Sequence, residues 1–303
     1  MKYMKIFNNF DEYTKSKPLF LTIGFFDGVH LGHEKILTTL VKKAKSEGYP
    51  SAVITFSFHP LKLLNYSHGK LLIMPLEQKL DYFKKIGVDY AFVLDFNKHI
   101  VQMQAKDFIE EILAKKLKVK KIYIGEDFRF GKDRYGDIKL LKKHGEIFWF
   151  FVIPVPLLKI GSETVSSTKI RGYITKGNFK KIETFLGRKY SLIGTVTEGR
   201  GISRDIQFPT ANMYFDEVLL PPEGIYAGWA KIDGKTYKSA FFVATEPKRL
   251  IEAHIIGLKK NIYNKQVEII FFKKLRSRIV FKTRQAAQKQ IAKDVERVNK
   301  MLE

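Results

Sequence analysis

The stretch GFFDGVHLGH, residues 24–33, decides the fold of the N-terminal half. It follows an apolar run at Leu19–Phe25 that is typical of a buried strand, and it leads into a helical pattern with apolar Ile36, Leu40 and Ala44. In an open parallel sheet, ligands bind beyond the carboxyl ends of the strands, and free N–H groups at a helix start favour phosphate. The stretch therefore predicts an anion-binding loop in an α/β domain.

Side chains in this loop suit the same chemistry. Gly24, Gly28 and Gly32 allow a ligand to approach the backbone closely. His30 and His33 are three residues apart, so they share one face of the first helical turn and can donate hydrogen bonds to phosphate oxygens. Taken alone, the histidine pair is a weak signal, because such a spacing also arises by chance or as part of a metal site. No third ligand is evident nearby in the sequence.

Alternation of short apolar runs with helical segments continues to about Lys181 and predicts a parallel sheet covered by helices. The further candidate strands are Ala52–Phe56, Tyr90–Leu94, Lys121–Ile124 and Ile147–Ile153. Two more helices are expected around the apolar sets Leu76, Leu80, Phe83, Ile86 and Phe108, Ile109, Ile112, Leu113. The longest apolar stretch, Phe148–Leu158, is shorter than the roughly 20 residues of a membrane helix and is expected to be a buried strand.

Beyond Leu186 the helical period gives way to short β-rich segments separated by glycine and proline, which predicts a second, antiparallel domain. The candidate strands are Leu192–Val196, Ala211–Tyr214, Ile225–Ile232, Lys235–Val243, Ile251–Ile256 and Val267–Phe272. Asp233-Gly234 between two of them is a strong hairpin signal. A sparse apolar face from Lys282 to Leu302 predicts a final helix. We therefore expect domains at residues 1–186 and 187–303.

Composition limits the classes of function. The 303 residues include 54 Lys and Arg against 31 Asp and Glu, a formal net charge of +23, and 45% are hydrophobic, which excludes a disordered chain. Cysteine is absent, so disulfides, thiolate nucleophiles and Cys-based zinc sites are excluded. The first residues become polar too early for a secretory signal, so we expect a cytoplasmic protein. The dispersed positive charge is either a solvated lysine-rich surface or a field that gathers nucleotides or nucleic acid.

Three further stretches accompany the histidine loop: TFSFHP at residues 55–60, GEDFRFG at 125–131 and VSSTKIR at 165–171. In the last stretch, Ser166 or Ser167 is a good helix N-cap that leaves N–H groups free for an anion, and Arg171 offers a forked donor to phosphate. Helix capping alone would also explain the serines.

Together these stretches resemble the motifs of the nucleotidylyltransferase superfamily in the form found in bacterial FAD synthetases. The resemblance implies catalytic roles in adenylyl transfer for His30, His33 and Arg171. The nucleotide-binding residues that it implies are Gly24, Phe25, Asp27, Gly28, Gly32, Ser166, Ser167 and Thr168. The flavin-binding residues that it implies are His59, Asp127, Phe128 and Phe130. Ser57, Phe58 and Thr164 stand where the family usually has an acidic residue, proline and arginine.

The second half carries GTVTEGRG at residues 194–201, FPTAN at 208–212 and EAH at 252–254, which resemble the flavokinase pattern. That resemblance implies nucleotide binding by Gly199, Thr210 and Asn212, and a general-base role for Glu252 toward the riboflavin hydroxyl. It also implies a magnesium site at Thr210 and Asn212, whose oxygen donors suit this hard cation. Departures from the pattern are Gln207 for glycine, Ala244 for glycine and Arg278 for glutamate.

Over nearly the whole chain the sequence resembles the bacterial bifunctional riboflavin kinase/FMN adenylyltransferases. The resemblance implies a Rossmann-like α/β nucleotidylyltransferase domain, then a small antiparallel β-barrel flavokinase domain with a C-terminal helix. It implies use of ATP and Mg²⁺ to convert riboflavin to FMN and FMN to FAD, with release of pyrophosphate. The departures leave open an FMN adenylyltransferase with a catalytically degenerate kinase-like domain. A nucleic-acid-binding protein on this scaffold is a lower alternative; no membrane partner is expected, and the sequence predicts no oligomeric state.

Overall fold

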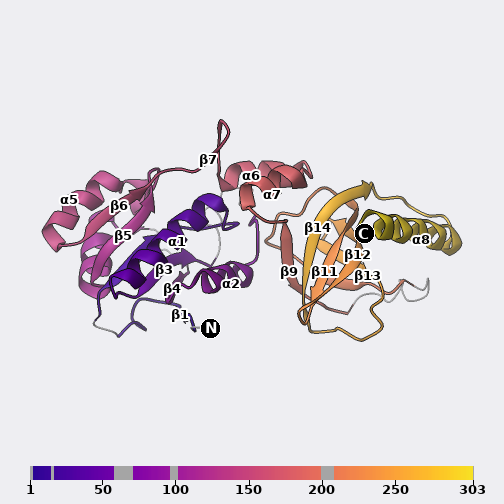
Figure 1. Ribbon diagram of the computed structural model, residues 1–303, viewed down its shortest axis with the longest axis horizontal. Helices are drawn as coiled ribbons and strands as arrows, with labels where there is room; N and C mark the ends of the chain where they lie inside the picture. The colour runs from indigo at the N-terminus through magenta and orange to yellow at the C-terminus, as the bar shows by residue number, and fades with distance from the viewer. Residues whose placement is uncertain (1–2, 15–16, 58–70, 96–101, 199–207, 303) are drawn as a thin grey trace. The chain divides into compact units, whose positions relative to one another are not determined.

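The computed structural model describes residues 3–14, 17–57, 71–95, 102–198 and 208–302. The chain forms two compact units (Figure 1). The first comprises Met1–Leu72 and Leu76–Ser166, and the second comprises Ile73–Pro75 and Ser167–Glu303.

The first unit is built on a six-stranded sheet with the order β1-β4-β3-β2-β5-β6. The strands are β1 Lys5–Phe7, β2 Leu19–Ile23, β3 Ser51–Phe56, β4 Tyr90–Leu94, β5 Val119–Gly125 and β6 Phe151–Val155. Every pairing between them is parallel. From β2 the chain adds β3 and β4 on one side and β5 and β6 on the other, so the strand order changes direction between β2 and β5.

Helices connect the parallel strands, as a parallel sheet requires. They are α1 Leu31–Ser46, α2 Leu76–Ile86, α4 Ala105–Asp107, the π-helix η2 Phe108–Lys116, the short 3₁₀-helix η3 Lys132–Arg134 and α5 Ile138–Phe148. After β6 a small hairpin, β7 Lys159–Ile160 with β8 Glu163–Thr164, leads out of the unit. The three expected helices are thus present at the expected places.

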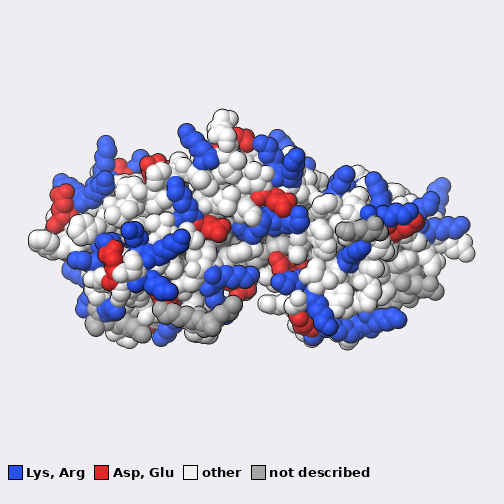
Figure 2. Space-filling model, in the orientation of Figure 1, with Lys and Arg blue, Asp and Glu red and all other residues white. Residues whose placement is uncertain are grey.

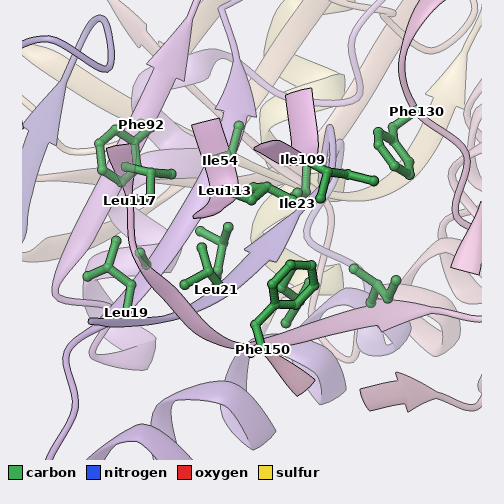
Figure 3. Packing of buried hydrophobic residues seen from close by; sticks show 14 of the residues in the cluster. Leu19, Leu21, Ile23, Ile54, Phe92, Ile109, Leu113, Leu117, Phe130 and Phe150 are labelled. Atoms are coloured by element: carbon green, nitrogen blue, oxygen red, sulfur yellow. The ribbon is translucent and has the colours of Figure 1, made fainter. Parts of the chain in front are cut away.

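The core of the first unit lies between the sheet and the η2 helix (Figure 3). Its buried side chains include Leu19, Leu21, Ile23, Ile54, Phe92, Ile109, Leu113, Leu117, Phe130 and Phe150. Fully burying one such side chain contributes about 1.5–3 kcal/mol, so this cluster stabilises β2 and the strands on both of its sides. The loops that follow those strands are therefore mounted on a buried hydrophobic core.

Most strand positions agree with the sequence, but the prediction for β6 was wrong. Ile147 and Phe148 end helix α5, and the strand begins only at Phe151. The strand is also not buried, because Phe151 is 59% exposed and Ile153 is 37% exposed. β6 is the last strand of the sheet, so its outer edge has no neighbouring strand and alternate side chains face outward.

The second unit contains a six-stranded antiparallel sheet with the order β10-β13-β12-β11-β14-β9. Its strands are β9 Ser191–Thr195, β10 Ala211–Tyr214, β11 Gly224–Ile232, β12 Lys235–Ala244, β13 Leu250–Ile255 and β14 Gln266–Arg276. A bridge between Thr197 and Asn212 joins the two ends of the sheet into a nearly closed barrel. Asp233 and Gly234 have φ of 48° and 80°, as the expected hairpin turn requires.

In the described part of the second unit, the helices are α6 Ser167–Thr175, α7 Phe179–Leu186 and α8 Arg284–Met301. The C-terminal helix α8, yellow in Figure 1, packs Val298 and Leu302 against Ala227, Ala240 and Leu275. An α/β domain, an antiparallel barrel and a C-terminal helix confirm the predicted fold class. No helix in the described ranges is both long and apolar enough to cross a membrane.

Candidate functional site

The loop between β2 and α1 lies where the order of the parallel strands changes direction. β2 ends at Ile23 and α1 begins at Leu31, with β3 on one side of β2 and β5 on the other. In open α/β sheets, ligands bind beyond the carboxyl ends of the strands at such a switch point. The loop 24–33 therefore occupies the position that the sequence predicted for an anion site.

His30 and His33 form one ordered unit at the start of α1. His30 is the N-cap of the helix, and its Nδ1 accepts a hydrogen bond of 3.2 Å from the backbone N–H of His33. Because Nδ1 is the acceptor, the neutral His30 ring carries its proton on Nε2. The two rings stack with their centroids 3.5 Å apart and an angle of 17° between their planes. The pair thus offers a fixed N–H donor next to the helix N-terminus.

Two glycines make room for this arrangement. A Cβ atom on Gly32 would lie 3.2 Å from the His30 ring, which is close enough that the ring would have to shift slightly. A Cβ atom on Gly24 would lie 2.9 Å from the ring of Phe26, whose edge contacts the His33 ring at a centroid distance of 5.1 Å. Side chains at positions 24 and 32 would therefore disturb the two histidines.

The remaining nucleotide-binding candidates of the loop are Phe25, Asp27 and Gly28, and they lie between the strand and the histidines. Gly28 has a φ of 81°, a conformation that favours glycine. Burial lowers the pKa of Lys79 on α2 to about 8. The negative charge of the buried Asp27 acts in the opposite direction and offsets part of this shift. Sequence reasoning missed Lys79, although a lysine three residues after Leu76 falls on the apolar face of that helix.

The loop after β5 carries the flavin-binding candidates Asp127, Phe128 and Phe130. The rings of Phe128 and Phe130 stack, with a centroid distance of 5.4 Å and an interplanar angle of 13°. Phe130 is buried in the core, whereas Phe128 is only partly buried against it. Gly136 is needed opposite, because its Cβ would lie 2.7 Å from the Phe130 ring. The loop follows β5, which is next to β2 in the sheet. It therefore lies across the switch point from the loop that carries the histidines.

The hydroxyl-rich motif is found at the start of α6. Ser166 ends the first unit and directly precedes the helix, while Ser167, Thr168 and Arg171 lie in its first turns and belong to the second unit. Ile170 and Ile174 are fully buried and form the inward face of the helix. All four candidate side chains retain some exposure, as residues that bind a ligand must.

In the barrel, three sequence motifs meet around one pair of strands. Asn212 of β10 is directly opposite Glu252 of β13, so both side chains point to the same face with Cβ atoms about 4.5–5.5 Å apart. Thr210 lies two residues before Asn212. The N–H of Thr197, which lies within the stretch 194–201, donates to the carbonyl oxygen of Asn212 at 2.9 Å. The Thr210 hydroxyl, the Asn212 amide and the Glu252 carboxylate therefore belong to neighbouring positions of the barrel.

His254 fixes the loop that carries Thr210. Its Nδ1 lies 3.0 Å from the carbonyl oxygen of Pro209, and the ring of Phe208 meets the His254 ring edge-on at 5.2 Å. His254 is two residues after Glu252 on the same strand, so both project from the same face. The sequence had placed Glu252 and His254 in one motif, and the structure adds that the histidine holds the neighbouring motif.

One departure from the family pattern, Arg278, lies close to the strand position opposite Glu252. Phe242 of β12 is opposite Glu252, and the guanidinium of Arg278 lies 5.8 Å from the centre of the Phe242 ring. Arg278 also approaches Glu223, with 3.8 Å between a guanidinium nitrogen and the carboxylate oxygen. His59, Gly199 and Gln207 lie outside the described residues.

The donors near Glu252 suit a magnesium ion bound together with a phosphate. The Thr210 hydroxyl and the Asn212 amide offer oxygen ligands, and Mg²⁺ prefers one or two such protein ligands completed by water and phosphate. Within the ranges that the structure describes, there is no group of three or more His, Cys, Asp or Glu that could hold a metal ion. The donor set thus fits a phosphate-bound Mg²⁺ better than a metal held by protein alone.

Comparison with known proteins agrees with this division of motifs. Residues 12–169 match the FAD synthetase family and residues 186–302 match the riboflavin kinase family. A bifunctional riboflavin kinase/FMN adenylyltransferase from Buchnera aphidicola is 33% identical over 290 residues, covering 92% of this chain and 93% of that protein. The protein of the same name from Haemophilus influenzae is 33% identical over 282 residues, covering 91% and 92%.

A solved structure resembles the chain along its whole length. The crystal structure described as a macrolide-efflux protein from Streptococcus pneumoniae covers 98% of both chains with a TM-score of 0.83 and 26% identity. The fold, the order of the motifs and the identity to the curated relatives point in one direction, and they confirm the resemblance found in the sequence. The chain therefore belongs to the family of bifunctional riboflavin kinase/FMN adenylyltransferases.

Proposed function

We propose that this protein makes FAD from riboflavin in two ATP-dependent steps, phosphorylation to FMN and adenylylation of FMN. The observation that carries the proposal is that the family likeness spans both halves, at residues 12–169 and 186–302. We assign adenylyl transfer to a domain at residues 1–186 and phosphoryl transfer to a domain at residues 187–303, a boundary supported by where the second match begins.

In adenylyl transfer, a phosphate oxygen of FMN attacks the α-phosphorus of ATP. A new P–O bond forms as the bond to the β-phosphate breaks, and pyrophosphate leaves with the extra charge. His30 and His33 act by donating hydrogen bonds to the phosphate oxygens on which charge develops, assisted by the N-terminus of α1. Their stacked rings and the buried His30 N-cap support this role, since a fixed donor needs no reorganisation during the reaction.

The other predicted residues of this reaction bind and orient the substrates. Arg171 holds triphosphate oxygens with its fork of N–H groups, next to the hydroxyls of Ser166, Ser167 and Thr168. The loop residues Gly24, Phe25, Asp27, Gly28 and Gly32 surround the nucleotide, and His59, Asp127, Phe128 and Phe130 seat the flavin. The partly buried ring of Phe128, stacked on Phe130, supports the flavin assignment because a flavin ring packs on such a face.

In phosphoryl transfer, Glu252 takes the proton of the riboflavin 5′-hydroxyl as the oxygen attacks the γ-phosphorus of ATP, and ADP leaves. Asn212, Thr210 and Gly199 bind the nucleotide. Thr210 and Asn212 would also hold Mg²⁺, which supplies positive charge that offsets the charge of the phosphates. The direct pairing of Asn212 with Glu252 supports this assignment, because it sets base and phosphate ligand side by side.

The test is to incubate the purified protein with Mg²⁺-ATP and either riboflavin or FMN, and to separate the flavins by chromatography. We expect riboflavin to yield both FMN and FAD, and FMN to yield FAD. FAD made from FMN, with riboflavin left untouched, would overturn the kinase half of the proposal. A cytoplasmic location stays a prediction from the sequence.

A further inference from the structure

A lysine is buried beside the histidine loop. Lys79 lies on α2, and only 4% of it is exposed. It comes three residues after Leu76 and four before the fully buried Phe83, so it occupies the inward face of its helix. A buried ammonium is costly unless it is fully hydrogen-bonded, and an apolar residue would fill this space at less cost.

The ammonium of Lys79 is fully hydrogen-bonded within the protein. Its Nζ donates to the carbonyl oxygen of Phe25 at 3.1 Å, to Oγ1 of Thr55 at 3.0 Å and to the carbonyl oxygen of Phe56 at 3.0 Å. The Thr55 hydroxyl in turn donates to the carbonyl oxygen of Phe25 at 3.1 Å. An ammonium has three N–H groups and no acceptor, so it matches three converging acceptors exactly in number.

Charge and ring contacts strengthen the same arrangement. Nζ lies 4.6 Å from the centre of the Phe25 ring, within the range of a cation–π interaction. The buried Asp27 favours the charged form of the lysine. Both Phe25 and Asp27 belong to the loop, so every one of these interactions acts on the loop that carries the histidines or on the end of β3.

The loop needs such a support because of its backbone. Between Phe25 and His30, two residues other than glycine have positive φ, Phe26 at 53° and Val29 at 37°. That region is unfavourable for side chains of this kind and persists only where surrounding contacts impose it. The Phe26 ring also contacts the His33 ring and the ring of Phe83 on α2. A shift at Phe25 would therefore be transmitted to the histidines.

We propose that Lys79 is a positioning residue for adenylyl transfer: its ammonium clamps the start of the β2–α1 loop to the end of β3 and thereby aligns His30 and His33. The inference rests on the function proposed above for the two histidines. Lys79 acts through the loop, since its three N–H groups are already used inside the protein.

The test compares two variants of Lys79 in the full chain with a matched control. Lys79→Met keeps the length of the side chain and removes all three donors, and Lys79→Gln keeps two N–H donors without charge. Lys84→Met changes an exposed lysine of the same helix. Each protein is assayed for FAD formation from FMN and for FMN formation from riboflavin, with kcat and KM determined separately.

We expect Lys79→Met to lower kcat of FAD formation at least tenfold with KM for ATP and FMN within threefold, because misplaced donors lose strength mainly in the transition state. Lys79→Gln should recover part of kcat, and Lys84→Met should match the parent protein. Kinase activity should stay within twofold in all three. A folded Lys79→Met protein with unchanged kcat of FAD formation would overturn the proposal.

The same variants also cover two further outcomes. If Lys79→Met does not fold, Lys79→Gln provides the test. A reduced kcat of FAD formation with unchanged kinase activity would support the positioning role of Lys79. A kcat of FAD formation equal to that of the parent protein would overturn it. Equal loss of both activities in Lys79→Gln would show a merely structural role and would also overturn it. His33→Ala separates this inference from the function on which it rests, because full FAD formation in His33→Ala would refute the role of the histidine whatever Lys79 does.

Discussion

At the scale of single residues, the adenylyl-transfer proposal depends on the ring of His33. His33→Ala removes the stacking partner of His30 but leaves the backbone N–H that binds the His30 ring. Since one lost donor to a developing charge costs about 10²–10³ in rate, FAD formation from FMN should fall by about that factor. Chromatographic assay of both reactions checks this. Equal loss of FMN formation from riboflavin would argue against separate sites.

Glu252 is the corresponding residue of the kinase reaction. Its amide variant Glu252→Gln keeps the shape opposite Asn212 and removes the base. General-base catalysis contributes about 10²–10⁴ in rate, so phosphorylation of riboflavin should fall by at least 10²-fold while FAD formation from FMN persists. Glu246→Gln, at an exposed glutamate in the loop that precedes β13, is the control. A parental phosphorylation rate in Glu252→Gln would remove this residue from the mechanism.

The buried Lys79 predicts a particular dependence of stability on pH. Burial lowers its pKa from 10.5 to about 8, so between these values the unfolded chain binds more protons than the folded one. The contribution of Lys79 to the free energy of unfolding therefore rises with pH, by about 2 kcal/mol from pH 7 to pH 10. Denaturant titrations of the parent protein and of Lys79→Met at both pH values measure this difference. A difference that does not change with pH would contradict the shifted pKa.

At the scale of elements, the C-terminal helix α8 is held to the barrel by a buried ion pair. The Arg276 guanidinium donates to both carboxylate oxygens of Asp294 at 2.7–3.1 Å, and these side chains are 16% and 6% exposed. Removing one partner of a buried pair leaves the other charge unpaired, which costs about 3–5 kcal/mol.

We therefore expect Asp294→Asn to lower the free energy of unfolding by about 2–4 kcal/mol, since the amide keeps part of the hydrogen bonding. Thermal and denaturant melts of the full chain measure it. Glu296→Gln on the same helix is the matched control, because Glu296 pairs with Lys300 at the exposed surface and its loss should leave the melting midpoint unchanged. Equal effects of the two variants would refute the anchoring role of Arg276 and Asp294.

Local sequence patterns predicted most helices and strands. They failed where the same pattern occurs in two different structural environments. Tyr90–Leu94 was located to the residue because an apolar run lies between Gly87 and a polar segment, and Asp233-Gly234 marked its hairpin. An apolar run does not distinguish a central strand from an edge strand, so the burial of β6 was mispredicted. Its start was misplaced because Trp149, with φ of 60°, ends α5 inside the run.

The candidate residues were likewise found where their motif is continuous in sequence. The stack of His30 on His33 follows from their spacing on one helical turn, and the pairing of Asn212 with Glu252 was not predictable because strand register is set by the whole barrel. Lys79 was missed because its three acceptors come from two other segments of the chain. The only sequence signal was a lysine on an apolar helix face. The roles of all these residues stay predictions.

At the scale of the whole molecule, the proposed reactions do not yet explain the large positive charge. Lys and Arg are spread over the visible face with Asp and Glu between them, and they form no single patch there (Figure 2). The formal net charge is nevertheless +23. A dispersed field attracts anionic ligands without specific contacts, and salt screens it over about 8–10 Å.

This field should act on the two flavin substrates differently, because FMN carries a phosphate and riboflavin is neutral. At saturating ATP, raising the salt concentration from 50 to 300 mM should lower kcat/KM for FMN about two- to fivefold and leave kcat/KM for riboflavin nearly unchanged. Initial rates at both salt concentrations measure the two constants. Equal salt effects on both substrates would show that the charge plays no part in flavin capture.

The position of an isotope label shows whether one chain catalyses both steps. Riboflavin is incubated with the protein, Mg²⁺ and ATP labelled at the γ-phosphate, and the flavins are separated. We predict label in both FMN and FAD, because the phosphate gained in the first step remains within FAD. Unlabelled flavins, in a protein that still converts added FMN to FAD, would contradict it.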